Sequence, residues 1–171
     1  DRVIRMKREI IGSATHAIAI SESTKRDMID IYGIDPAKIT VAHLGSSFLD
    51  KEPESKKNES TVAPYLLYVG TRDAYKNFKP MLSAIADILR KDRISLVCAG
   101  GRGLTIEEQK LIAALKLTGL VKHKPIDDST LATLYANAIA FIFPSLYEGF
   151  GIPILEAFSC NCPCVISNTS S

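Results

Sequence analysis

The sequence lacks a large net charge and any marked charge asymmetry. Its 171 residues include 21 lysines and arginines against 19 aspartates and glutamates, and the two kinds are balanced on either side of residue 60. Proteins that bind nucleic acid backbones need clustered basic side chains to neutralise the phosphates. We therefore expect no nucleic acid among the partners of this protein.

Long hydrophobic runs are also lacking. The longest apolar stretches, such as residues 138–144, fall well below the roughly 18 to 20 residues that a membrane-spanning helix needs. The first residues show no signal-peptide pattern, and Asp1 stands where a complete chain would begin with methionine. We therefore expect a cut or fragmentary chain without a membrane-spanning helix.

Cysteine is scarce, with four residues in the whole chain. Cys160, Cys162 and Cys164 fall in the run Cys-Asn-Cys-Pro-Cys, and the fourth cysteine is Cys98. Structural zinc sites commonly use C-x2-C pairs, whereas this run spans an expected helix end and strand start with a proline inside it. We expect ordinary buried thiols in a reducing compartment and no metal site, with a metal or a disulfide as the less favoured alternative.

The sequence does contain enough apolar material for one core, since 46% of its residues are hydrophobic. Near the N-terminus, residues 16–21 alternate as a strand does, and residues 39–44 resemble a second strand. Between them, Ser21 or Ser23 can cap an amphipathic helix that ends at Gly33. We expect this segment to be a small α/β appendage.

Residues 50–61 (DKEPESKKNEST) contain no apolar side chain, which predicts a linker and a domain boundary. Beyond them, strand-like and helix-like segments alternate regularly. The expected strands are 65–69, 95–99, 120–123, 139–143 and 164–167, and the expected helices are 78–91, 105–115 with a capping box of Thr105 and Glu108, 129–137 and 153–159. Such alternation is typical of an α/β fold with a doubly wound parallel sheet.

Ligands of doubly wound sheets bind outside the carboxyl ends of the strands. The loop after the first of these strands contains Gly70, Arg72 and Lys76 just before a helix. Backbone N–H groups, the positive end of the helix dipole and the lysine charge would together attract a phosphate. The alternative is an ordinary glycine turn with solvated basic side chains.

A second loop, residues 144–157, carries the stronger signal. Glu148 and Glu156 are separated by seven residues across a turn that contains Gly149 and Gly151. Glycoside hydrolases hold two carboxyl groups about 5 to 9.5 Å apart, whereas eight residues span about 12 Å on a continuous helix. The spacing favours two acids that hold different parts of one extended ligand.

The segment PSLYEGFGIPILEAFSCNCPCVISN resembles the E-x(7)-E motif of retaining glycosyltransferases of family 4, which have the GT-B fold. VGTRDAYKNF is similar to the phosphate loop of that family, although Thr71 stands where many members have a basic residue. HAIAISESTKRDMIDIYGIDPAKITVAHLGSSF resembles the end of its N-terminal domain, and KPIDDSTLATLYANAIAFIFPS its nucleotide-base segment. The resemblance covers nearly the whole chain.

The resemblance implies a role for each of these residues. Lys76, with Gly70 and Arg72 beside it, would neutralise the donor diphosphate, and Glu156 would accept hydrogen bonds from the ribose. The transferred sugar would be held by Glu148, Gly149, Phe150 and Gly151, and the base would lie beside Ile126. Lys76 and Glu148 would be the catalytic pair.

The implied activity is the transfer of a hexosyl group, with mannosyl favoured, from a nucleotide-diphosphate sugar to a glycan or lipid-linked acceptor, with retention of configuration. The resemblance implies no cofactor and no metal. It also implies a cytoplasmic protein and leaves peripheral association with the inner face of the membrane open.

Under this interpretation, residues 1–49 are the end of an acceptor-side domain, and residues 62–171 are a donor-binding domain that lacks its last elements. We therefore expect the chain to be a half-site that is inactive alone. Two other hypotheses remain open, namely a non-catalytic module that binds nucleotide sugars and an epimerase-like or phosphatase-like enzyme. Lys76, Glu148 and Glu156 together favour transfer, because a simple nucleotide-binding domain has no need of the second acid.

Overall fold

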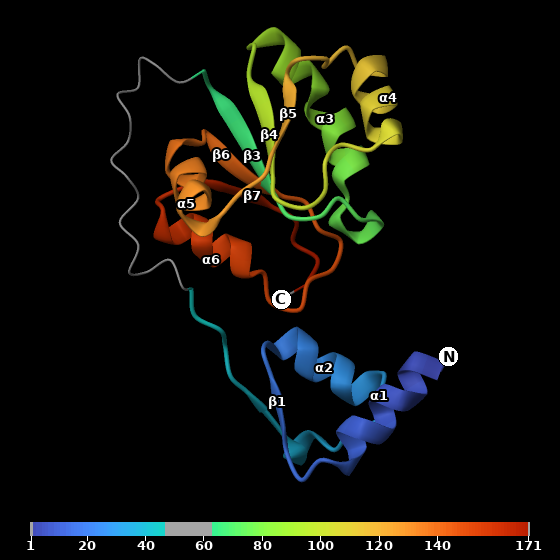
Figure 1. Cartoon of the computed structure of the whole chain (residues 1–171). Helices are drawn as coiled ribbons and strands as arrows, with labels where there is room; N and C mark the ends of the chain where they lie inside the picture. The colour runs from blue at the N-terminus through green and yellow to red at the C-terminus, as the bar shows by residue number, and fades with distance from the viewer. Residues whose placement is uncertain (1, 47–62, 171) are drawn as a thin grey trace. The chain divides into compact units, whose positions relative to one another are not determined.

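The computed structural model describes residues 2–46 and 63–170 (Figure 1). The chain forms two compact units, and the first consists of Asp1–Gly45, Tyr147–Ile152 and Thr169–Ser171. The second unit consists of Ser46–Leu146 and Pro153–Asn168. The linker predicted over residues 50–61 lies outside the described residues.

The first unit has a two-stranded parallel sheet in which Ala17 pairs with Ile39. Its elements are α1 (Arg2–Ser13), β1 (Ala17–Ala19), α2 (Glu22–Asp30), the 3-10 turn η1 (Pro36–Lys38) and β2 (Ile39–Val41). Ser21 caps α2, as predicted, because its side chain accepts a hydrogen bond from the Thr24 N–H group. The helix ends at Asp30, short of the predicted end at Gly33.

Helix α1 is absent from our sequence-based expectations. Its apolar residues Val3, Ile4, Ile10 and Ile11 recur at helical spacing, which is the signal that could have revealed it. None of its residues is buried, so it adds little to the core of Ala19, Met28, Ile34 and Ile39.

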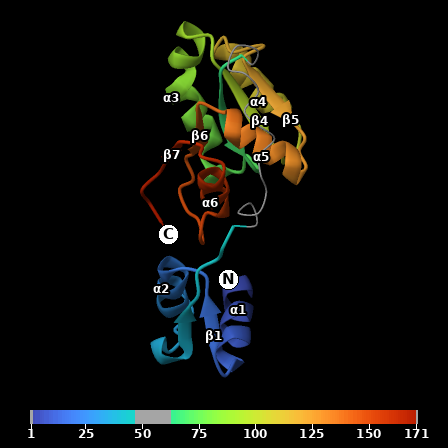
Figure 2. The same ribbon diagram turned by 90° about the vertical axis from the view of Figure 1, so that its left-hand side faces the viewer.

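The second unit is built on a five-stranded parallel sheet with the order β5-β4-β3-β6-β7. Its strands are labelled in Figure 1, and Figure 2 shows the same unit turned by 90°. The strands are β3 (Tyr65–Val69), β4 (Ser95–Ala99), β5 (Val121–Lys124), β6 (Ala140–Phe143) and β7 (Cys164–Ile166). The other elements are the 3-10 turn η2 (Ala74–Lys76) and the helices α3 (Phe78–Lys91), α4 (Ile106–Ala114), α5 (Asp128–Asn137) and α6 (Ile152–Ser159). This confirms the predicted α/β fold with a parallel sheet.

Two layers of helices cover this sheet, because successive side chains of a strand point to opposite faces. Leu67 and Val69 of β3 pack in one cluster with residues of α5 and α6. Tyr68, which lies between them, packs in the other cluster with residues of α3 and α4. Figure 1 shows these helix pairs on opposite faces of the sheet.

The strand order reverses at β3. From this strand the chain passes to β4 and β5 on one side, and it later returns to add β6 and β7 on the other side. The carboxyl ends of β3 and β6 therefore form the switch point at which such sheets bind ligands. In the described part of the chain, no helix is both long and apolar enough to cross a membrane.

Candidate functional site

The loop from β3 to α3 has the backbone geometry that suits an anion. Gly70 adopts φ +107°, a conformation that few other residues can adopt, and its N–H group donates to the Ala99 carbonyl oxygen at 2.9 Å. Asn77, the N-cap of α3, is left-handed and makes no side-chain capping hydrogen bond. The first N–H groups of α3 therefore donate no hydrogen bond to the Asn77 side chain, and the helix dipole adds to their attraction for an anion.

Lys76 lies at the switch point. Its ammonium nitrogen is 5.2 Å from the ring centroid of Phe143, the last residue of β6, and 5.2 Å from that of Tyr75. Because Lys76 itself follows β3, its charge is placed beside the carboxyl ends of both central strands. The structure thus positions this predicted site residue where an anionic ligand of the sheet would bind.

Glycine residues allow the loops after β3, β4 and β5 to lie in close contact. A Cβ atom at Gly101 would lie 2.9 Å from the carbonyl oxygen of Gly70, so no larger residue fits without displacing backbone. A Cβ atom at Gly100 would lie 3.2 Å from Cδ1 of Ile126. The structure therefore brings Gly70 and Ile126, predicted to contact phosphate and base, to one edge of the sheet.

Glu156 lies on α6, which covers the same face of the sheet as Ile126. The hydroxyl of Tyr135, on α5, donates to Oε2 of Glu156 at 3.1 Å. Burial, and after it the charge of Glu156, raises the pKa of Tyr135, so this hydroxyl remains a donor. Sequence reasoning missed Tyr135, because nothing in the pattern of α5 distinguishes it from a core aromatic residue.

Arg72 is enclosed by protein. Its Nε donates to Oε1 of Glu108 at 3.0 Å, and Nη2 donates to the Gly103 carbonyl oxygen at 2.9 Å. The side chains of Arg72 and Glu108 are 0% and 3% exposed. Donor binding by Arg72 remains a prediction, but sequence reasoning missed this ion pair, whose partner lies 36 residues away.

The loop 147–152 belongs to the first unit. There the Ser21 hydroxyl donates to the Gly149 carbonyl oxygen at 2.6 Å, and the ring of Phe150 lies 5.9 Å from that of His43. The Glu148 N–H group donates to Ser170 Oγ at 2.8 Å, and Gly151 adopts φ +92°. The predicted site residues are therefore divided, with the sugar-binding group in the first unit and the phosphate, base and ribose groups in the second.

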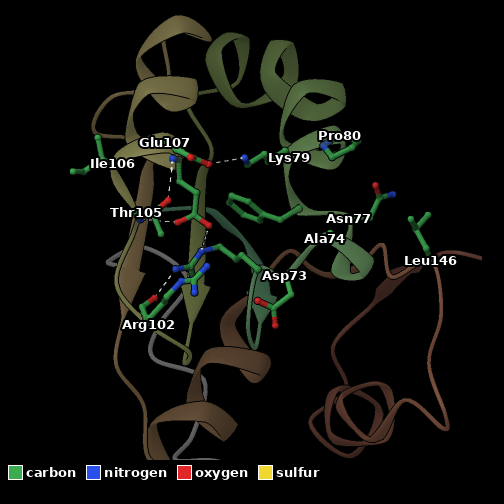
Figure 3. Close-up of a pocket in the computed structure, with 13 residues that line it drawn as sticks. Asp73, Ala74, Asn77, Lys79, Pro80, Arg102, Thr105, Ile106, Glu107 and Leu146 are labelled. Atoms are coloured by element: carbon green, nitrogen blue, oxygen red, sulfur yellow. Dashed lines mark hydrogen bonds and ion pairs between the residues drawn. The ribbon is translucent and has the colours of Figure 1, made fainter. Parts of the chain in front are cut away.

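A cavity of the second unit has a volume of about 1020 Å³ and lies on the side of α3 and α4 (Figure 3). Lys79 of α3 and Glu107 of α4 point toward one another there and form an ion pair at 3.2 Å. Among the predicted donor residues, only Arg72 lines this cavity. Lys76 and Ile126 lie instead in the loops that follow β3 and β5, at the carboxyl-end edge of the sheet, and Glu156 lies on α6.

The cysteines are free thiols, and Cys98, Cys160 and Cys162 are buried, as predicted. Burial raises the pKa of Cys162 to about 11, so its thiol stays protonated at neutral pH. Within residues 2–46 and 63–170, no group of three or more His, Cys, Asp or Glu residues could hold a metal ion.

The family described as glycosyl transferases group 1 matches residues 50–171. O-antigen chain mannosyltransferase B of Escherichia coli is 30% identical over 185 aligned residues, which cover 100% of this chain and 49% of that protein. D-inositol 3-phosphate glycosyltransferase of Frankia alni is 30% identical, with coverage of 93% and 43%. The chain thus spans about half the length of the curated relatives it matches.

Solved structures agree on the fold. A glycosyltransferase from Rickettsia africae superposes with a TM-score of 0.76 at 20% identity and covers 96% of this chain, which covers 48% of that one. WaaG, a glycosyltransferase involved in lipopolysaccharide biosynthesis, gives a TM-score of 0.76 at 19% identity, with coverage of 90% and 44%. At these identities the likeness shows the fold alone.

Proposed function

The chain belongs to the glycosyl transferases group 1 family, and from that premise we propose that the whole protein transfers a hexosyl group from a nucleotide-diphosphate sugar to a glycan or lipid-linked acceptor. The observation that carries this proposal is the position of Lys76, whose ammonium lies at the carboxyl end of β6 beside β3. A full positive charge at the switch point suits the diphosphate of such a donor.

Each part of the donor has a group of suitable chemistry. The diphosphate would meet Lys76 and the N–H groups of the loop that begins at Gly70. The base would lie against Ile126, and Glu156, oriented by Tyr135, would accept hydrogen bonds from the ribose hydroxyls. Glu148 and the backbone around Phe150 would hold the transferred sugar.

The proposed reaction retains configuration at the anomeric carbon. The bond between that carbon and the phosphate oxygen breaks, and its electron pair leaves with the nucleoside diphosphate. An acceptor hydroxyl forms the new bond on the same face of the sugar, and its proton passes to the leaving diphosphate. Lys76 and the helix-end N–H groups stabilise the charge that develops there, without a metal in this mechanism.

Mannose is the transferred sugar that we favour. The relatives include O-antigen chain mannosyltransferases from Escherichia coli and Salmonella typhimurium and an MMP alpha-(1->4)-mannosyltransferase from Mycolicibacterium hassiacum. Other relatives carry different names, such as glycogen synthase of Mycobacterium tuberculosis.

The first prediction concerns the isolated chain. We expect it to bind a nucleoside diphosphate at the carboxyl ends of the strands, and to show no sugar transfer until the rest of the protein supplies the acceptor side. Calorimetry with UDP, GDP and ADP and their sugars tests binding, and a liganded structure locates it. Binding at the opposite edge of the sheet would overturn the site, and transfer by the 171-residue chain would overturn the half-site interpretation.

The second prediction concerns Tyr135. Replacement by phenylalanine removes the hydroxyl that holds one oxygen of Glu156. Since a hydrogen bond contributes about 0.5 to 1.5 kcal/mol, we expect the Kd for nucleoside diphosphate to rise about two- to tenfold in titration calorimetry.

Tyr65→Phe is the matched control for that change. The Tyr65 hydroxyl is also buried and donates to the Leu134 carbonyl oxygen of α5 at 2.7 Å, but it makes no bond to Glu156. Both variants should lose stability, and only Tyr135→Phe should lose affinity. That loss should vanish with a 2′,3′-dideoxynucleoside diphosphate. An equal loss in both variants, or one that persists without ribose hydroxyls, would assign Tyr135 a purely structural role.

A further inference from the structure

Arg72 is the anchor of an otherwise exposed loop. From Thr71 to Tyr75 every residue except Arg72 is exposed, whereas the Arg72 side chain is completely buried. Its guanidinium lies 5.7 Å from the ring centroid of Phe78, the first residue of α3. Arg72 is thus the one buried side chain of this loop, whose backbone also accepts hydrogen bonds from the Tyr68 hydroxyl at Thr71 and from the Leu146 N–H group at Tyr75.

Glu108 is the partner that makes the anchor specific. One carboxylate oxygen accepts from Arg72, and the other accepts from the Thr105 N–H group at 2.7 Å within the capping box of α4. Burial alone would raise the pKa of Glu108, but the hydrogen bonds from Thr105 and Arg72 outweigh it and lower that pKa. Glu108 is thus ionised at neutral pH, and it joins the β3–α3 loop to the start of α4.

The remaining contacts of the guanidinium also face inward. Nη2 donates to the carbonyl oxygens of Arg102 and Gly103, which lie in the loop after β4. Nη1 is buried and has no hydrogen-bond partner within the part of the chain that the structure describes. A cation that is neutralised by a buried carboxylate and wrapped by carbonyl groups has little charge to offer an external diphosphate.

We propose that Arg72 is a positioning residue rather than a ligand of the donor. Its ion pair with Glu108 fixes the β3–α3 loop against the N-terminus of α4 and so places Lys76 for the diphosphate. This inference rests on the proposed function, because it assumes that Lys76 meets the diphosphate.

The direction in which Glu108→Gln changes the affinity for nucleoside diphosphate distinguishes a positioning role of Arg72 from a ligand role. If Arg72 binds the diphosphate directly, Glu108→Gln removes a competing negative charge and should strengthen diphosphate binding. If Arg72 positions the loop, Glu108→Gln loosens the anchor, and we expect affinity for nucleoside diphosphate to fall about three- to tenfold. Glutamine preserves the size of the side chain, so this variant leaves no large cavity.

Arg72→Lys is the second variant of this experiment. A lysine keeps the charge but cannot bridge Glu108 and two carbonyl groups as a guanidinium does. A positioning role predicts the same three- to tenfold loss, roughly, as in Glu108→Gln, and little further loss in the double variant, because both changes break one unit. Retained affinity in Arg72→Lys would overturn the proposal, and so would tighter binding by Glu108→Gln.

Calorimetry of the 171-residue chain with nucleoside diphosphate and with nucleoside gives the required readout. A purely structural role would lower the melting temperature without changing the ratio of the two affinities. The proposal requires the affinity for nucleoside diphosphate to fall more than the affinity for nucleoside. Lys76→Ala in the same assay distinguishes a failure of the proposed function from a failure of the role given to Arg72. If Lys76→Ala leaves the affinity for nucleoside diphosphate unchanged, the proposed function of the loop is wrong. If Lys76→Ala lowers that affinity but Glu108→Gln and Arg72→Lys do not, only the role of Arg72 is wrong.

Discussion

Lys76→Ala is expected to lower the turnover of the whole enzyme by about a hundredfold to a thousandfold, the range seen when one preorganised group that stabilises developing charge is removed. In the proposed reaction, the nucleoside diphosphate leaves with a negative charge that grows as the sugar–phosphate bond breaks. The Lys76 ammonium lies at the carboxyl end of β6, where that charge develops in our proposal. The loss should therefore fall mainly on kcat and not on KM for the acceptor.

Steady-state kinetics of the full-length protein measure this effect. Lys91→Ala is the matched control. Lys91 is the last residue of α3, whereas Lys76 lies just before its first residue, so this substitution removes the same charge far from the site. The isolated chain offers a second measurement, in which Lys76→Ala should weaken nucleoside diphosphate far more than nucleoside. Equal kcat values for the two lysine variants would show that Lys76 has no special part in catalysis.

Glu156→Ala is expected to raise the Kd for nucleoside diphosphate by about tenfold to a hundredfold, since hydrogen bonds to a charged group contribute roughly 1.5 to 3 kcal/mol. The Tyr135 hydroxyl occupies Oε2 of the carboxylate and orients it. In our proposal the ribose hydroxyls donate to this oriented carboxylate. Loss of the carboxylate should therefore weaken nucleoside and nucleoside diphosphate alike, unlike the loss of Lys76.

Cys162→Ser is the control for this variant, because Cys162 is buried on the same side of the sheet and is expected to leave affinity unchanged. Titration calorimetry gives the affinities, and circular dichroism establishes that both variants are folded. If Glu156→Ala binds as the unaltered chain does, Glu156 is a structural residue of α6. The site then reduces to Lys76 and the glycine turn.

The elements of the second unit were predictable because their signals are local. Strands β3 and β4 and helix α3 begin and end at the predicted residues, and the capping box of Thr105 and Glu108 is present. Each rests on a run of apolar residues, a cap or a glycine within a few positions of the element itself. Helix α1 was not predicted, although its apolar residues recur at helical spacing.

The candidate site was predictable only in part. Lys76 could be placed at the edge of the sheet, because the loop between a strand and the following helix of a parallel sheet lies there. Arg72, four residues earlier, received the same interpretation, yet its guanidinium turns inward to Glu108. No role was predicted for Tyr135, although its hydroxyl donates to Glu156, which lies 21 residues later in the sequence.

The sequence by itself therefore determined the order and type of the strands and α-helices in the second unit and their parallel sheet, and the edge at which a ligand binds stays a prediction. These properties follow from periodicity and turn chemistry, which act over a few residues. Only the tertiary structure decided which polar groups pair inside the protein, as Arg72 does with Glu108 and Tyr135 does with Glu156. The physical reason is that a buried charge must find its partner in space, and the partner can lie anywhere in the chain.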